Sequence, residues 1–183
     1  MRIEKIAGLP AHPLFVHVPI VLLPLVAVGA VAMAFSARVR ERLGWTILGL
    51  AVVAGISTQL AISSGEALQD QVDSSSALRH HVAIAESIRP LALLLFLAAL
   101  AVMLIDRRDK GAWPFRSKSG AATVRGVTAA VGVVVVVMAL LTCARLYDIG
   151  DSGAKATWQR TQVSARPPAS AQTLASSTPP GRR

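Results

Sequence analysis

Four stretches of this chain are apolar for about twenty residues each, the length a helix needs to cross the hydrocarbon core of a bilayer. They cover approximately residues 14–35, 44–63, 82–105 and 126–144. The composition agrees, since 53% of the 183 residues are hydrophobic and 16% are charged, whereas a soluble domain carries about 25% charged residues. The sequence therefore predicts an all-α integral membrane protein whose four-helix bundle occupies residues 14–155.

The segments that flank the bundle differ from it in composition. Residues 1–13 precede the first apolar stretch, and we expect them to form a short outer segment. Residues 156–183 are rich in Ser, Ala, Thr, Pro and Arg and have no sustained apolar period, which predicts a disordered tail. No internal repeat of clear register is apparent.

Basic residues are distributed unequally between the two ends of the predicted bundle. The first and third connections carry nine, whereas the N-terminal segment and the second connection carry three. Because basic loops remain in the cytoplasm, both termini are expected outside a bacterial inner membrane. The nine are Arg38, Arg40, Arg42, Arg107, Arg108, Lys110, Arg116, Lys118 and Arg125, and the three are Arg2, Lys5 and Arg79.

The net charge of +9 needs no nucleic-acid partner. Basic loops next to the anionic inner leaflet explain much of it, and no nucleic-acid-binding motif is present. The expected partner is the lipid bilayer.

All four histidines fall on the predicted outer side. His12 and His17 lie at the start of the first span, and His80 and His81 lie at the start of the third. A titratable side chain at membrane depth is costly, so His17, inside the span, is the first functional candidate. Positions five apart on a helix differ by about 140°, so His12 and His17 cannot face the same partner on a continuous helix. Pro13 predicts that His12 precedes the helix.

Two imidazoles from facing helices of a bundle can ligate a haem iron or contribute to a zinc or copper site. We therefore hypothesise haem ligation by His17 and His81, with His12 and His80 as alternates. A ligating imidazole needs an acceptor for its other ring nitrogen, and Glu66 or Glu86 could supply it.

Two further patterns concern packing. Glu86 and Arg89 are spaced i, i+3 and are predicted to pair along one helix face, with Pro90 disturbing the backbone just after them. Small residues at Gly44, Gly49 and Gly55 are consistent with close approach of the second helix to its neighbours.

The opening block from His12 to Pro19, the pair His80-His81 and the block Gly150 to Ala154 resemble the bacterial membrane proteins of the family named domain of unknown function 2231. The resemblance covers about residues 10–158. The last block of that family often holds a histidine where this chain has Asp151. At this departure from the family pattern no third imidazole is available, and Asp151 is instead expected to orient His12 or His17, or to cap the outer end of the helix. The resemblance implies a small cytochrome-like bundle associated with redox modules.

The leading functional hypothesis is a haem-binding electron-transfer or respiratory accessory protein, with a redox protein or a second copy of the chain as partner. One alternative is a non-catalytic membrane scaffold or subunit. Another is a small metal or proton transporter, although the inner halves of the spans hold almost no titratable residues. The sequence identifies no catalytic residue and no soluble-enzyme motif.

Overall fold

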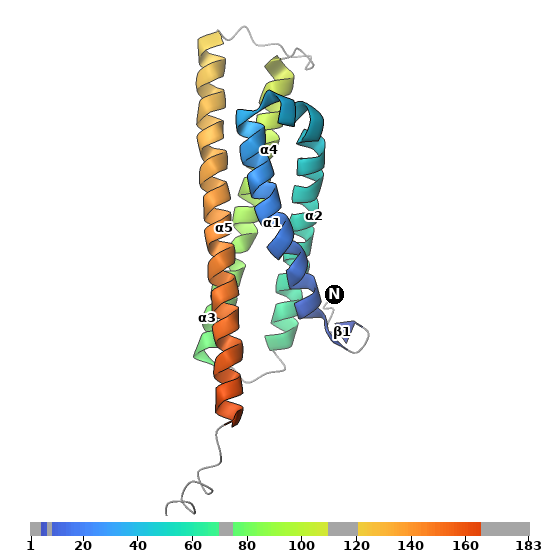
Figure 1. The fold of residues 1–183 in the computed structure, drawn as a ribbon, viewed down its shortest axis with the longest axis vertical. Coiled ribbons are helices and arrows are strands. Elements are labelled where there is room, and N and C mark those ends of the chain that lie inside the picture. The colour runs from blue at the N-terminus through green and yellow to red at the C-terminus, as the bar shows by residue number, and fades with distance from the viewer. Residues whose placement is uncertain (1–4, 7–8, 70–74, 110–120, 166–183) are drawn as a thin grey trace, which may run out of the picture.

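The computed structural model describes residues 5–6, 9–69, 75–109 and 121–165 of the chain, and this part is almost entirely helical (Figure 1). Its helices are α1 (Ala11–Phe35), α2 (Ala37–Gln69), α3 (Ser76–Glu86), α4 (Ile88–Asp109) and α5 (Ala121–Ala165). A small antiparallel ribbon of β1 (Lys5–Ile6) and β2 (Leu9–Pro10) precedes α1.

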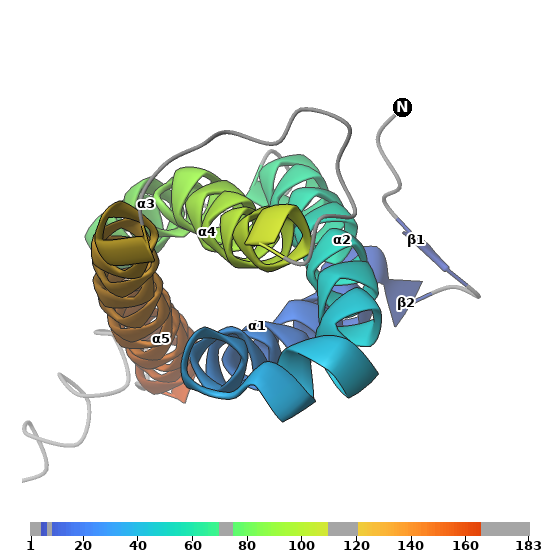
Figure 2. The ribbon, with the colours of Figure 1, turned by 90° about the horizontal axis from the view of Figure 1, so that it is seen from above.

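Within the described residues, four segments are long and apolar enough to cross a membrane, which confirms the predicted number of spans and the all-α fold. They are His12–Phe35, Ala37–Gln69, Ser76–Arg107 and Gly126–Trp158, so that α3 and α4 together make one crossing. Viewed along the bundle, α1 and α4 lie opposite each other, and each packs against both α2 and α5 (Figure 2).

The centre of the bundle is filled mainly by small and medium apolar side chains. Ala30, Met33 and Ala54 are fully buried, whereas Val28 and Leu140 are more than half exposed on the outside of the bundle. This distribution suits a bilayer, because small side chains let helices approach closely while large apolar side chains face the lipid.

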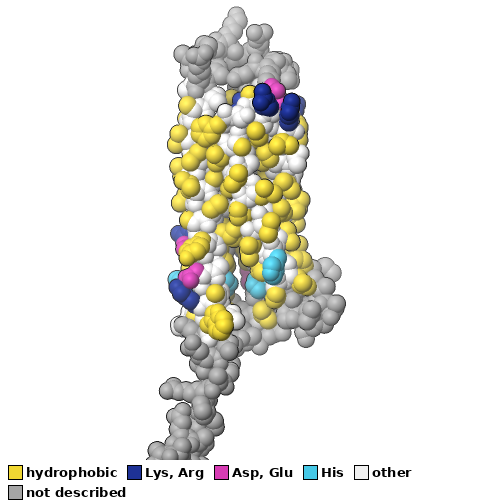
Figure 3. All heavy atoms as spheres, viewed as in Figure 1, with side chains coloured by type: hydrophobic (Ala, Val, Ile, Leu, Met, Phe, Trp, Pro, Cys, Tyr) yellow, Lys and Arg dark blue, Asp and Glu magenta, His cyan; other side chains and the backbone are white. Residues whose placement is uncertain are grey.

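An ion pair closes the end of the bundle where α1 turns into α2. Arg40 Nε lies 3.0 Å from Asp106 Oδ1 on α4, and Arg40 Nη1 donates to the Met33 carbonyl at 2.6 Å. Both charged side chains are about 85% buried, with 15% and 14% exposed. Nearby, the Arg107 guanidinium stacks over the Trp45 ring, 5.0 Å from its centroid. The histidines lie at the other end of the bundle, and basic side chains are visible at both ends (Figure 3).

The third crossing is broken at Ser87, between α3 and α4. Pro90 lacks an N–H, and its ring would clash with the carbonyl of Glu86 in a regular helix. The backbone responds with a tighter turn, in which the Ser87 amide and hydroxyl donate to the Ile84 carbonyl at 3.0 and 2.6 Å. The predicted disturbance at Pro90 is thereby confirmed.

Two boundaries differ from the sequence-based ones. Helix α1 begins at Ala11, so His12 is already helical and Pro13 occupies the first turn, where its missing N–H costs nothing. Helix α5 continues to Ala165, so residues 156–165 of the predicted tail are helical. Alanine, arginine and glutamine in this segment are strong helix formers. The rest of the predicted tail lies outside the described residues.

Candidate functional site

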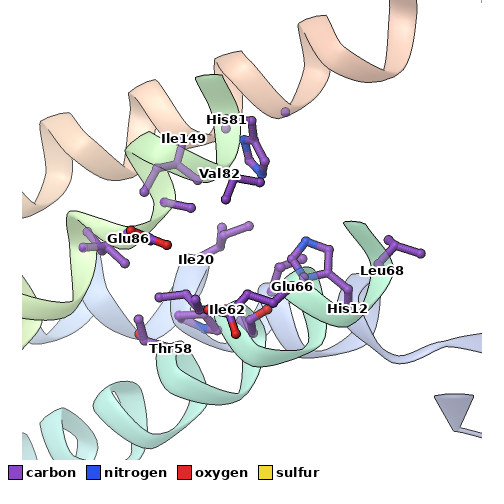
Figure 4. Close-up of a pocket in the computed structure, with 18 of the residues that line it drawn as sticks. His12, Ile20, Thr58, Ile62, Glu66, Leu68, His81, Val82, Glu86 and Ile149 are labelled. Atoms are coloured by element: carbon purple, nitrogen blue, oxygen red, sulfur yellow. The ribbon is translucent and has the colours of Figure 1, made fainter. Parts of the chain in front are cut away.

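A cavity of about 490 Å³ lies inside the histidine-bearing end of the bundle, with residues from all five helices in its wall. Its lining is mostly apolar, and His12, His81, Glu66 and Glu86 are its titratable side chains. The close-up shows His81 and His12 on different sides of this space (Figure 4). The space-filling view shows a narrow hollow between α5 and α1 at the level of the histidines (Figure 3).

The imidazole of His12 is held by α2. Its Nδ1 lies 2.9 Å from the Ala61 carbonyl oxygen and 3.4 Å from the Ser64 hydroxyl. That hydroxyl donates its own hydrogen to the same carbonyl at 2.9 Å. Because a carbonyl oxygen can only accept, Nδ1 carries the proton of the neutral ring. The lone pair is therefore on Nε2.

The imidazole of His81 is held by α5 in a similar way. Its Nδ1 lies 3.0 Å from the Ser152 hydroxyl, which donates to the Ile149 carbonyl at 3.0 Å. A hydroxyl that donates to the Ile149 carbonyl accepts from His81, and Nδ1 then carries the ring proton, as in His12. The Ile149 carbonyl also interacts with this ring. Here too the lone pair is on Nε2.

A glycine lies under each of these two rings. A Cβ atom added at Gly65 would come within 3.0 Å of His12 Cε1, and one added at Gly153 would come within 3.1 Å of His81 Cε1. Both distances are closer than ordinary van der Waals contact, so each ring occupies space that only glycine leaves open.

The sequence reasoning missed Ser64, Gly65, Ser152 and Gly153 as parts of the site. A signal was present, because the dipeptide Ser-Gly occurs at the histidine-bearing end of two different helices.

The structure brings His12 and His81 to one cavity and places His17 and His80 elsewhere. His17 is exposed, and its Nδ1 bonds to the Pro13 carbonyl of its own helix. His80 is exposed on α3 and, like His17, is not among the cavity residues. The predicted divergence of His12 and His17 is confirmed, with His12 as the one that faces inward.

The acidic residues behave differently from the sequence-based expectation. Arg89 Nη2 lies 3.0 Å from Glu66 Oε1, so Arg89 pairs with α2 and the predicted pairing with Glu86 is wrong. The break at Ser87 ends the regular helix between positions 86 and 89 and removes their common face. Within the described residues, Arg89 Nε is buried without a hydrogen-bond partner. The acceptors for the imidazole protons come from a carbonyl and a hydroxyl, and not from Glu66 or Glu86.

Asp151 has neither of the roles expected for it from the sequence. It is exposed, and its carboxylate accepts from Lys155 Nζ at 2.6 Å, one turn further along α5. Because α5 continues beyond it to Ala165, Asp151 caps no helix end. The neighbouring Ser152 holds an imidazole instead.

The chain matches a family described as predicted membrane proteins, DUF2231, over residues 8–165. It belongs to the DUF2231 family. The match includes all four spans, both cavity histidines and the two Ser-Gly pairs. No curated protein matches this DUF2231 chain, and no solved structure does.

The donor set of this DUF2231 protein limits what its cavity could hold. In the described part of the chain, no cluster of three or more His, Cys, Asp or Glu side chains is suited to a metal ion. The cavity instead offers two imidazoles whose Nδ1 atoms are hydrogen-bonded, which leaves Nε2 of each ring to act as a ligand. Such a set suits a metal that brings most of its own ligands with it.

Proposed function

We propose that this DUF2231 protein binds haem in the membrane and takes part in electron transfer, with His12 and His81 as the axial ligands. One observation carries the proposal: imidazoles from different sides of one cavity each commit Nδ1 to an acceptor on a neighbouring helix. Histidine ligands normally have their second nitrogen fixed in this way, because the bond sets the tautomer and the ring orientation.

The cavity fits such a group in size and lining. Its volume of about 490 Å³ falls within the range of about 300–1,000 Å³ found for small-molecule and cofactor sites. Apolar side chains such as Val16, Ile20 and Ile62 line it, which suits the faces of a porphyrin. A porphyrin supplies four in-plane nitrogens, so two protein ligands complete the coordination of its iron. When bound, the iron would supply a one-electron redox couple.

The other residues of the site would hold and tune the ligand pair. The carbonyl of Ala61 and the hydroxyl of Ser152 keep each ring in its Nδ1-protonated form. The mostly apolar wall lowers the local dielectric, which strengthens the effect of nearby charges on a redox centre. Glu66 and Glu86 contribute the carboxyl groups of this wall.

We place the protein in the bacterial inner membrane with both termini outside and the cavity near the outer leaflet. The distribution of charge supports this orientation, because Arg38, Arg40, Arg42 and Arg107 lie at the end opposite the histidines and basic residues near short loops favour the cytoplasmic side. A redox protein would then meet the cavity end from the outside, or a second copy would do so within the membrane.

An absorption spectrum tests the proposal. The protein is expressed with ample haem and purified in detergent, and we expect a Soret band that the double variant His12→Ala/His81→Ala lacks. His17→Ala and His80→Ala are matched controls, because both histidines are exposed at the same end of the bundle, and each should keep the band. A wild-type protein without a Soret band would contradict haem binding. Loss of the band in His17→Ala would contradict the assignment to His12.

A further inference from the structure

The surroundings of the two cavity histidines repeat each other residue by residue. The His12 side uses Ala61, Ser64 and Gly65 of α2, and the His81 side uses Ile149, Ser152 and Gly153 of α5. On each side a serine donates to the carbonyl three residues before it. On each side the imidazole Nδ1 bonds within this turn, and its ring lies over the glycine that follows the serine.

The correspondence extends to the rest of the cavity wall. Four wall positions of α1 recur 69 residues later in α3 and α4, and six wall positions of α2 recur 88 residues later in α5. The first set is His12, Pro13, Val16 and Pro19, matched by His81, Val82, Ala85 and Ile88. The second set is Thr58, Ala61, Ile62, Gly65, Leu68 and Gln69, matched by Leu146, Ile149, Gly150, Gly153, Ala156 and Thr157.

The arrangement of the helices follows the same rule. The hairpin of α1 and α2 and the hairpin of α3–α4 and α5 both start at the histidine end and return to it (Figure 1). Seen along the bundle, α1 lies opposite α4, and α2 lies opposite α5 (Figure 2). A half-turn about the bundle axis therefore exchanges the two hairpins. Sequence comparison conceals this relation, because the two offsets differ and few residue types are shared.

We propose that the cavity consists of two equivalent half-sites related by this pseudo-two-fold axis, and that it takes a planar metal complex which accepts one imidazole on each face. The inference rests on the proposed function for the identity of that complex as haem. Its added content is that the two imidazoles are held by equivalent surroundings, one in each half-site. The iron would be six-coordinate and low-spin, closed to small molecules such as oxygen, so the site would carry electrons. Ser64, Gly65, Ser152 and Gly153 are positioning residues.

The first test needs no haem. In protein labelled with ¹⁵N at histidine, NMR spectra should show His12 and His81 both in the Nδ1-protonated tautomer. Ser152→Ala should shift the signals of His81 and leave those of His12 in place, because the two half-sites use different helices. Finding the Nε2-protonated tautomer at either residue would overturn the equivalence of the half-sites, whether or not haem binds.

The second test uses the haem-loaded protein. Electron paramagnetic resonance should show low-spin iron in the wild type, and His12→Gly and His81→Gly should each convert it to high-spin. Added imidazole should restore the low-spin signal in both variants, because each leaves the same vacancy. Conversion by His81→Gly alone would overturn the equivalence while haem binding stood. A wild type that never loads haem would instead overturn the proposed function.

A third test concerns the glycines. Gly65→Ala and Gly153→Ala would each push a methyl group against an imidazole, so both should shift the low-spin g-values and the reduction potential. Gly55→Ala and Gly126→Ala are matched controls on the same two helices, since an added Cβ meets no atom within 4 Å there. Unchanged g-values and potential in the Gly65 and Gly153 variants would overturn the positioning role.

Discussion

Arg89 reaches from α4 to Glu66 on α2, with Nη2 and Oε1 3.0 Å apart. The bond joins α4, which follows the break at Ser87, to α2, whose Ala61 carbonyl is hydrogen-bonded to His12. Because Glu66 also lines the cavity, this ion pair ties the cavity wall together across the two hairpins.

The variant Glu66→Gln should lower the free energy of unfolding by about 0.5–1 kcal/mol, as expected for a partly exposed ion pair. The side chains of Arg89 and Glu66 are 37% and 39% exposed, which keeps the effect small. The measurement is unfolding in mixed micelles followed by circular dichroism. Glu86→Gln is the control. A larger loss for Glu86→Gln would argue that Arg89 pairs with Glu86, as the i, i+3 spacing first suggested.

The variant Asp106→Asn should destabilise the protein more, by about 3 kcal/mol, since it leaves the buried charge of Arg40 without its carboxylate. The same unfolding experiment measures this loss. Arg38→Gln is the control, because Arg38 is exposed and lies in the same turn of α2 as Arg40. It should change the free energy of unfolding by less than about 0.5 kcal/mol. Equal effects of the two variants would mean that the Arg40 pair contributes no more than a surface charge.

The number of spans and the gathering of histidines at one end were predictable from the sequence. Both depend only on the length of each apolar segment and on the order of the segments along the chain, and these can be read from the sequence. The separation of His12 from His17 was predictable too, since helical geometry sets the angle between them.

The choice of His12 over His17 as the inward residue could not be derived in the same way. In a soluble helix the apolar stripe marks the buried face, but α1 is apolar all round, with Val26 buried and Val28 69% exposed. Lipid accepts the same side chains as the core, so hydrophobic periodicity does not show which face of α1 points inward. The serine and glycine contacts were hidden because they depend on that rotation.

The glycines of α2 illustrate the same limit and support a prediction. Of the three glycines Gly44, Gly49 and Gly55, only Gly44 packs closely against another helix. A Cβ added at Gly44 would come within 2.9 Å of Met103 Cε, whereas one added at Gly49 or Gly55 would meet no atom within 4 Å. In Gly44→Ala the flexible end of the Met103 side chain must move, so we expect a small cost of about 1 kcal/mol from overpacking. Gly49→Ala should stabilise α2 by up to about 1 kcal/mol, since alanine favours a helix. Thermal unfolding in detergent gives the melting temperature of each variant. Equal changes in melting temperature for Gly44→Ala and Gly49→Ala would contradict the close packing at Gly44.

The orientation of the bundle can be tested by reporter fusions. Alkaline phosphatase is active only outside the cytoplasm, so a fusion after residue 165 should be active and one after residue 109 inactive, with a green fluorescent protein fusion giving the reverse. The reason is the cluster of Arg38, Arg40 and Arg42, which favours the cytoplasmic side.

Replacing Arg38 and Arg42 by Glu should weaken this preference, and Arg40 stays unchanged because it forms an ion pair with Asp106. An active phosphatase after residue 109 of the wild type would place the histidine cavity at the cytoplasmic leaflet, and its redox partner would then be sought there.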